Sequence, residues 1–124
     1  MPKKILVVDD EENIRDLFKS ELTDEGYDVV TAGSGEEGLA YFEREVPDLV
    51  TLDIKMPGIG GIAALRAIRE KHPVVPIIML TAYPEFKADF DVWAADAYVV
   101  KSADLSGLIE KVRFLLKEGK ESRQ

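Results

Sequence analysis

The sequence contains no cysteine, one tryptophan and one histidine. Without cysteine the chain forms no disulfide, and thiol catalysis and iron–sulfur chemistry are excluded. It has no run of about 18 apolar residues, the length that a transmembrane helix needs, and no basic segment followed by an apolar stretch at its start. We therefore expect a cytoplasmic protein that does not associate with a membrane.

The chain has fewer basic than acidic residues. Lysine and arginine number 16 against 24 aspartates and glutamates, so the formal net charge is −8. Direct binding to DNA or RNA is not expected, because lysine and arginine contacts to phosphate supply most of that affinity. The composition, 46% hydrophobic and 32% charged over 124 residues, is typical of one globular domain. We expect this domain at residues 1–118, followed by a polar tail at 119–124.

Five short apolar runs divide the sequence. They are rich in valine, isoleucine and leucine and hardly alternate with polar residues, as expected of strands that are covered on both faces. The runs are Ile5 to Val8, Val29 to Ala32, Leu49 to Leu52, Val75 to Leu80, and Ala97 to Val100. Because each is followed by a segment with helical spacing, the pattern predicts an α/β fold with a doubly wound parallel sheet.

The expected helices carry apolar residues three and four positions apart. Their stripes are Ile14, Leu17, Phe18 and Leu22; Leu39, Phe42 and Val46; Ile62, Leu65 and Ile68; Phe86, Phe90 and Trp93; and Leu105, Leu108, Ile109, Val112 and Leu116. Gly26 is expected to end the first helix in a left-handed conformation. Ser34 and Glu37 have capping-box spacing, and Asp104 can cap the last helix.

Polar side chains follow four of the five apolar runs. The carboxyl ends of parallel strands share one edge of the sheet, where ligands bind near the point at which the strand order reverses. Three carboxylates, a hydroxyl and an ammonium group would meet at that edge, from Asp9, Asp10, Asp53, Thr81 and Lys101.

A cluster of three carboxylates must be neutralised. Two carboxylates about 4 Å apart repel by roughly 4 kcal/mol at an effective dielectric constant near 20, so the cluster takes up a proton or binds a cation. Mg²⁺ fits, because it binds one or two carboxylates together with waters and a substrate phosphate oxygen. Lys101 and Thr81 would then contact a transferred phosphoryl group.

Taken singly, each of these residues also has a simpler explanation. Asp9 and Asp10 are suited to capping a helix, and Asp53 to a turn. Thr81 is a common strand residue, and Lys101 could be a solvated strand end. The joint pattern at four strand ends favours the functional interpretation.

Four motifs together resemble the receiver domain of two-component response regulators. They are Ile5-Leu6-Val7-Val8-Asp9-Asp10-Glu11, Pro47-Asp48-Leu49-Val50-Thr51-Leu52-Asp53-Ile54-Lys55-Met56-Pro57-Gly58, Pro76-Ile77-Ile78-Met79-Leu80-Thr81-Ala82 and Ala95-Asp96-Ala97-Tyr98-Val99-Val100-Lys101. The resemblance extends from Lys3 to Leu116. It implies a flavodoxin-like (βα)5 fold with strand order 2-1-3-4-5, and transfer of a phosphoryl group from a histidine kinase onto Asp53.

The resemblance also implies a set of metal ligands. Asp10 and Asp53 would bind Mg²⁺ directly, and Asp9 directly or through water. The backbone carbonyl of Lys55 would complete the ligands that the protein supplies.

The resemblance further implies a phosphoryl contact and a switch. Thr81 and Lys101 would contact the phosphoryl oxygens, and Thr81 with Tyr98 would form the switch pair. The output face would comprise the fourth helix, the fifth strand and the fifth helix. Enzymatic capacity would be limited to assisting self-phosphorylation and autodephosphorylation.

The chain departs from the family pattern at three places. Ser102 follows Lys101, where the family usually has proline. The stretch between Thr81 and Lys101 is slightly shorter than usual. Lys55 and Tyr83 occupy sites that tune the lifetime of the acyl phosphate in the family.

The residues fit other functions of this fold less well. A phosphatase of the haloacid dehalogenase type would need an aspartate two positions after Asp53, where this chain has Lys55. Asp9 and Asp10 would repel the phosphate of a flavin. A receiver-fold interaction module that works without phosphorylation is the remaining alternative.

The implied partners are proteins. The resemblance implies a histidine kinase or phosphotransfer protein and a downstream protein target, and leaves dimerisation on phosphorylation open. Ile14 and Leu17 are either core residues or part of the surface on which the kinase docks.

Overall fold

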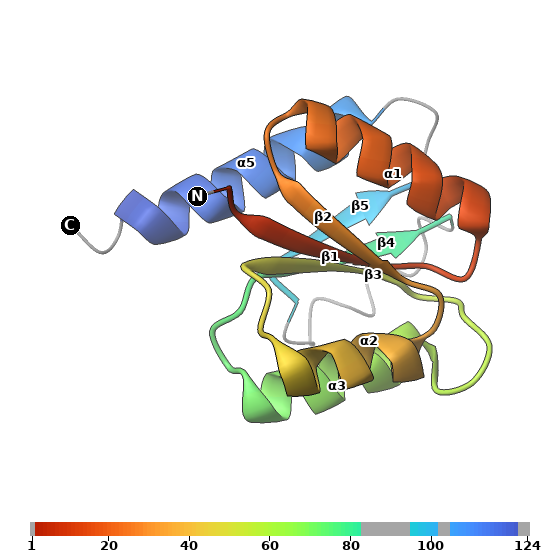
Figure 1. Cartoon of the computed structure of the whole chain (residues 1–124). Coiled ribbons are helices and arrows are strands. Elements are labelled where there is room, and N and C mark those ends of the chain that lie inside the picture. Colours follow the sequence, from red (N-terminus) through yellow and green to blue (C-terminus); the bar gives the residue numbers. More distant parts are fainter. Residues whose placement is uncertain (1, 83–94, 102–104, 122–124) are drawn as a thin grey trace.

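The computed structural model describes residues 2–82, 95–101 and 105–121, with backbone only at 118–121. Strands and helices alternate from β1 to β4, as the apolar pattern predicts, and the residues between β4 and β5 lie outside the described ranges (Figure 1). The elements are β1 (Lys4–Val8), α1 (Glu12–Asp24), β2 (Asp28–Ala32), α2 (Gly35–Arg44), β3 (Leu49–Asp53), α3 (Gly60–Lys71), β4 (Ile77–Thr81), β5 (Ala97–Val100) and α5 (Ser106–Glu121).

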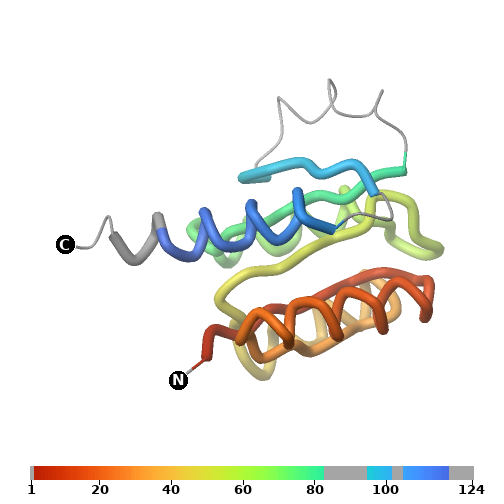
Figure 2. The backbone as a smooth tube through the Cα atoms, turned by 90° about the horizontal axis from the view of Figure 1, so that it is seen from above, coloured from red at the N-terminus to blue at the C-terminus, as the bar shows by residue number. Residues whose placement is uncertain are grey.

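The five strands form one parallel sheet in the order β2-β1-β3-β4-β5. Helices α1 and α5 cover one face of this sheet, and α2 and α3 cover the other (Figures 1 and 2). The predicted flavodoxin-like architecture and its strand order are therefore confirmed. Because the chain reverses its direction across the sheet between β1 and β3, the carboxyl ends of these two neighbouring strands lie at the switch point.

The sheet separates two hydrophobic clusters. Leu6, Val8 and Leu52 belong to the cluster under α2 and α3, while Ile5 and Val7 pack with residues of α1 and α5. Successive residues of a strand point to opposite faces, so a strand covered on both sides must be apolar throughout. This explains why the strand runs in the sequence do not alternate.

Two predicted helix boundaries are present. Gly26, with φ at +99°, follows the C-terminal end of α1 in the left-handed region. The Ser34 hydroxyl accepts a hydrogen bond from the Glu37 N–H at 3.0 Å. The Glu37 carboxylate accepts from the N–H of Gly33 rather than of Ser34, so the reciprocal half of the capping box is shifted by one residue.

The apolar stripe of α2 is shorter than predicted. The helix ends at Arg44, Glu45 is extended with φ −160° and ψ 133°, and Val46 is 50% exposed. Pro47 accounts for the difference, because the residue before a proline is pushed out of the helical conformation. The prediction that Val46 continues the buried stripe was therefore wrong.

Helix α5 continues to Glu121, so the expected boundary at residue 118 falls inside it. Several expectations concern residues outside the described ranges. These are the stripe Phe86, Phe90 and Trp93, the cap Asp104, and the departures at Tyr83 and Ser102. Among the described residues, no helix combines the length and apolar character that crossing a membrane requires.

Candidate metal and phosphoryl site

Three carboxylates meet at the switch point of the sheet. Asp9 and Asp10 directly follow β1, and Asp53 is the last residue of the neighbouring strand β3. One oxygen from each lies within 4.8 Å of the others. Asp9 is fully buried and Asp53 is 5% exposed, whereas Asp10 is exposed. The structure thus brings Asp53 together with the Asp9-Asp10 pair, more than forty residues earlier in the sequence.

Lys101 joins this cluster from the end of β5. Its Nζ lies 2.7 Å from Asp9 Oδ2, 3.1 Å from Asp53 Oδ2 and 3.8 Å from Glu11 Oε1. Its backbone N–H donates to the Thr81 carbonyl at 2.7 Å, which continues the β4–β5 pairing one residue beyond the strand. The serine that follows Lys101 therefore does not prevent its ammonium group from reaching the phosphoacceptor candidate.

A small cavity of about 130 Å³ opens beside Asp53. Its lining residues are Glu11, Asp53, Lys55, Thr81, Ala82 and Lys101. Thr81, at the end of β4, is 2% exposed. Tyr98 lies on β5, is half-buried and packs against the cluster under α2 and α3. A carboxylate, an ammonium group and a hydroxyl-bearing residue thus face one space of phosphoryl size.

The electrostatics of the site are unfavourable to a charged Asp53. Burial, and after it the charge of Asp9, raise the pKa of Asp53 to about 6 against the opposing effect of Lys101. Burial by itself would lower the pKa of Lys101, but hydrogen bonding to Asp9 and the charge of Asp53 outweigh burial and raise that pKa. Lys101 therefore stays positively charged, whereas the surroundings of Asp53 disfavour its negatively charged form.

Neighbouring residues hold the carboxylates in place. Asp9 Oδ1 accepts from the N–H of Glu11 at 2.9 Å, and Arg15 Nη1 donates to the Asp9 carbonyl at 2.8 Å. Gly61 lies against β3, where an added Cβ would come within 2.1 Å of the Asp53 carbonyl oxygen. Sequence reasoning missed these supporting roles of Arg15 and Gly61; the Gly60-Gly61 pair close after Asp53 was the available signal.

The two residues whose role the sequence left undecided take different environments. Ile14 is half-buried and packs against the cluster of α1 and α5, while Leu17 is 42% exposed. Leu17 therefore belongs to the surface of α1.

The donor set fits a hard divalent cation. All three candidate side-chain ligands are carboxylates, and Mg²⁺ prefers oxygen donors. Three ionised carboxylates and one ammonium group leave two negative charges without a counter-charge (−3 + 1 = −2). A divalent cation would supply that counter-charge.

The sequence profile of the response regulator receiver domain matches residues 5–113. The chain belongs to the response regulator receiver domain family. It is 41% identical over 122 residues to the alkaline phosphatase synthesis transcriptional regulatory protein PhoP of Bacillus subtilis. This alignment covers 94% of this chain and 50% of that protein. It is 43% identical over 118 residues to the probable transcriptional regulator ycf27 of Porphyra purpurea, covering 93% and 48%. The receiver domain thus spans about half the length of the curated relatives it matches.

Two solved structures of a similar receiver are informative. The response regulator TrrA of Thermotoga maritima, in complex with Mg²⁺-BeF, shares 53% identity and a TM-score of 0.87, covering 91% of this chain and 98% of that chain. TrrA in complex with the histidine kinase ThkA shares 54% identity and a TM-score of 0.85, covering 92% and 98%. This receiver domain is therefore a component of two-component signalling.

Proposed function

We propose that this receiver domain accepts a phosphoryl group from a histidine kinase onto Asp53, assisted by Mg²⁺. The observation that carries the proposal is the placement of Asp53, whose buried carboxylate lies 3.1 Å from the Lys101 ammonium group and faces a cavity of about 130 Å³. The kinase complex and the Mg²⁺-BeF complex of TrrA, at 53–54% identity, support the choice of donor and metal.

The transfer is a displacement at phosphorus. A carboxylate oxygen of Asp53 forms the new bond to phosphorus, and the bond to the imidazole nitrogen of the kinase phosphohistidine breaks. Phosphoryl transfer needs mainly positioning and charge neutralisation. Lys101 would hold one phosphoryl oxygen by charge, and the Thr81 hydroxyl would donate to another. Autodephosphorylation would return the phosphoryl group to water at the same site.

The metal would be held by the acid cluster. Asp10 and Asp53 would bind it directly, Asp9 directly or through water, and the Lys55 backbone carbonyl would complete the set. The location of Lys55 beside the same cavity supports this assignment. When bound, Mg²⁺ supplies positive charge that offsets the carboxylates and the incoming phosphoryl oxygens.

The response to phosphorylation would pass through Thr81 and Tyr98. Thr81 ends β4 beside the cavity, and Tyr98 lies on the adjacent strand opposite Met79. Movement of Thr81 towards the phosphoryl group would make room for Tyr98 to turn inward and would alter the surface around β5 and α5. A downstream protein would bind this altered surface, and the domain would act in the cytoplasm.

The test uses Mg²⁺ and acetyl phosphate with the intact chain. Mass spectrometry should show the gain of one phosphoryl group that is stable in acid and labile in base. Asp53→Asn should abolish the gain, and EDTA should prevent it. Asp16→Asn, which removes an exposed carboxylate of α1, is the matched control and should behave as wild type.

A second arm replaces acetyl phosphate with a phosphorylated histidine kinase. A wild-type chain that takes up no phosphoryl group from either donor would refute the proposal. The domain would then be a receiver-fold interaction module that works without phosphorylation.

A further inference from the structure

The edge strand β5 has a sequence that specifies its register poorly. Among the described strands it pairs only with β4, and its four residues, Ala97 to Val100, are all apolar. Ala97 and Val99 pack against the cluster of α1 and α5, while Tyr98 packs against the opposite cluster. A slip of one residue exchanges the two faces of a strand. Since β5 would still present apolar side chains to both faces, hydrophobic burial penalises such a slip only weakly.

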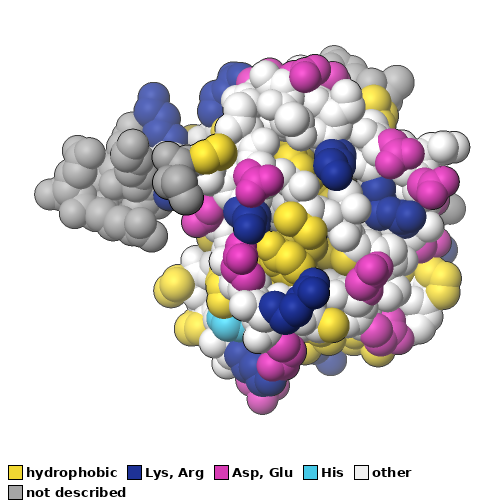
Figure 3. Space-filling model, viewed as in Figure 1, with side chains coloured by type: hydrophobic (Ala, Val, Ile, Leu, Met, Phe, Trp, Pro, Cys, Tyr) yellow, Lys and Arg dark blue, Asp and Glu magenta, His cyan; other side chains and the backbone are white. Residues whose placement is uncertain are grey.

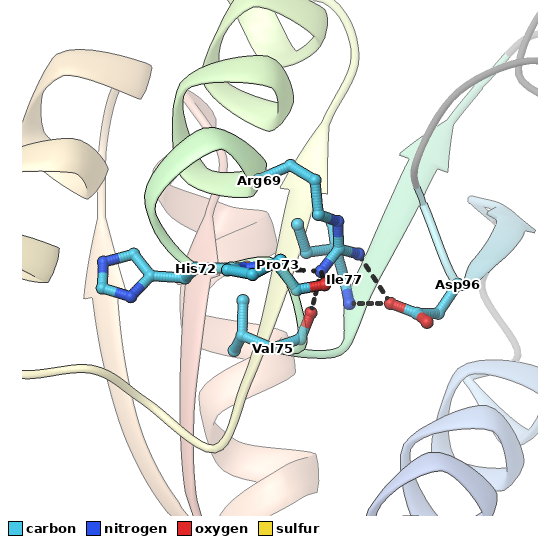
Figure 4. Close-up of polar contacts among 6 residues, drawn as sticks. All are labelled: Arg69, His72, Pro73, Val75, Ile77 and Asp96. Carbon is cyan, nitrogen blue, oxygen red and sulfur yellow. Dashed lines mark hydrogen bonds and ion pairs between the residues drawn. The ribbon is translucent and has the colours of Figure 1, made fainter.

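Asp96 fixes the beginning of β5 against β4. Its backbone N–H donates to the Ile77 carbonyl at 2.8 Å, and its Oδ2 accepts from the Ile77 N–H at 2.8 Å. One residue therefore binds both backbone groups of Ile77, as Figure 4 shows for the side-chain bond. This reciprocal pair defines which residue of β5 lies opposite which residue of β4.

Arg69, near the end of α3, holds the Asp96 carboxylate. Its Nη2 lies 2.9 Å from Asp96 Oδ2, and its Nη1 donates to the carbonyls of Val75 at 2.6 Å and Pro73 at 3.1 Å (Figure 4). The side chain of Arg69 is only 16% exposed. One guanidinium thus joins the end of α3, the loop before β4 and the start of β5. We call Arg69 and Asp96 the register clamp.

The other end of β5 carries Lys101. The register runs from Ile78 opposite Ala97 to Thr81 opposite Val100, and the Lys101 N–H then donates to the Thr81 carbonyl. A slip by one residue displaces a strand by about 3.3 Å. A displacement of that size would break the 3.1 Å contact between Lys101 Nζ and Asp53 Oδ2.

We propose that Arg69 and Asp96 are positioning residues that set the register of β5 and thereby place Lys101 at Asp53. Neither residue lines the cavity beside Asp53, and both act from the opposite end of the β4–β5 pair. The effect on phosphorylation rests on the proposed function, whereas the effect on register does not.

The test compares four variants. Asp96→Ala removes the acceptor for Ile77 and the partner of Arg69, and Arg69→Gln removes the ion pair. Asp96→Asn keeps an acceptor oxygen for the Ile77 N–H and is the conservative rescue. Lys71→Gln is the matched control, because Lys71 is also on α3 and forms an ion pair with Glu43. Both side chains of that pair are 70% exposed, in contrast to the mostly buried side chain of Arg69.

Amide hydrogen exchange measures how well the hydrogen bonds at both ends of the β4–β5 pair are kept. In Asp96→Ala and Arg69→Gln the amides of Ile77, of residue 96 and of Lys101 should exchange about five- to tenfold faster, as expected for the loss of one or two hydrogen bonds. The amides of Val8 and Leu52 in the central strands should keep the wild-type rate. Asp96→Asn should restore most of the protection, and Lys71→Gln should match wild type.

Phosphorylation by acetyl phosphate is measured on the same variants. The maximal rate should fall several-fold in Asp96→Ala and Arg69→Gln at unchanged affinity for Mg²⁺. Unchanged exchange at Lys101, faster exchange of all strands together, or unchanged phosphorylation despite faster exchange at Lys101 would each overturn the proposal. Failure of the wild type to be phosphorylated would refute the proposed function instead, and the exchange pattern would still decide the register.

Discussion

Buried polar residues of this domain are of two kinds. Asp9, Asp53 and Thr81 surround the candidate site. Thr51 instead lies in the middle of β3, opposite Val7 and Ile78 on its two neighbouring strands. Among the described residues its buried hydroxyl has no hydrogen-bond partner. A buried polar group without a partner costs roughly 1–3 kcal/mol of stability.

Replacing Thr51 with valine should therefore stabilise the domain. Valine keeps the shape of threonine and removes the unpaired hydroxyl, so the free energy of unfolding should rise by about 1 kcal/mol. Urea denaturation followed by circular dichroism measures the change. Thr31→Val on β2, where threonine is only half-buried, controls for the higher strand propensity of valine. A loss of stability in Thr51→Val would show that the hydroxyl is satisfied.

Single residues differed in how far the sequence could reveal their placement. The placement of Asp9, Asp53, Thr81 and Lys101 at one edge was predictable, because a parallel sheet brings the residues that follow its strands to one edge. That of Arg69 and Asp96 was not, since they are 27 positions apart and neither belongs to a strand-end pattern. A long-range ion pair leaves no periodic signal in a single sequence.

Helix α2 begins at a cap that the sequence identifies. Ser34 is extended, with φ −156° and ψ 164°, and its hydroxyl accepts from the Glu37 N–H. Such a cap satisfies one of the backbone donors that the first turn of a helix leaves unpaired. The stability of α2 therefore depends in part on this one hydroxyl.

Ser34→Ala should destabilise the domain by about 1 kcal/mol, the usual cost of losing a serine cap. Thermal and urea denaturation measure the effect. Ser20→Ala, within α1 and exposed, is the control, and it should be neutral or slightly stabilising because alanine favours the helix interior. Equal stability of Ser34→Ala and wild type would mean that water or the Glu37 contact with Gly33 replaces the cap.

Elements were predictable where periodicity and local breakers agree. Within the described ranges, five strands and four helices lie where the apolar runs and stripes place them, and Gly26 ends α1 as expected. Val46 shows the limit, since its spacing fits a helix while Pro47 prevents one. The exposure of Leu17 shows a second limit, because a helical stripe does not reveal how far the opposing layer extends.

The whole molecule concentrates negative charge in one small region of an acidic chain. On the face drawn in Figure 3, basic and acidic side chains are interspersed. At the switch point, by contrast, three carboxylates face one ammonium group. The fold therefore holds carboxylates together at a cost in stability that a bound cation would offset.

The pH dependence of stability in EDTA should expose that cost. Burial and the charge of Asp9 raise the pKa of Asp53 from 3.8 to about 6, so between these values the folded state binds more protons than the unfolded state. The stability that this group contributes is therefore greatest below about pH 4, falls as the pH rises through about 6 and levels off about one pH unit higher. Asp53→Asn lacks this dependence.

Urea denaturation of wild type and Asp53→Asn across this range measures the difference. The free energy of unfolding of the variant should rise relative to that of wild type with rising pH, by on the order of 3 kcal/mol above pH 6, a magnitude set by the size of the pKa shift. Adding Mg²⁺ above pH 6 should stabilise wild type more than the variant, because the cation relieves the repulsion in which Asp53 takes part. Parallel pH curves in EDTA would show that the neighbours of Asp53 do not disfavour its charge. Equal stabilisation of both proteins by Mg²⁺ would show that Asp53 is not a metal ligand.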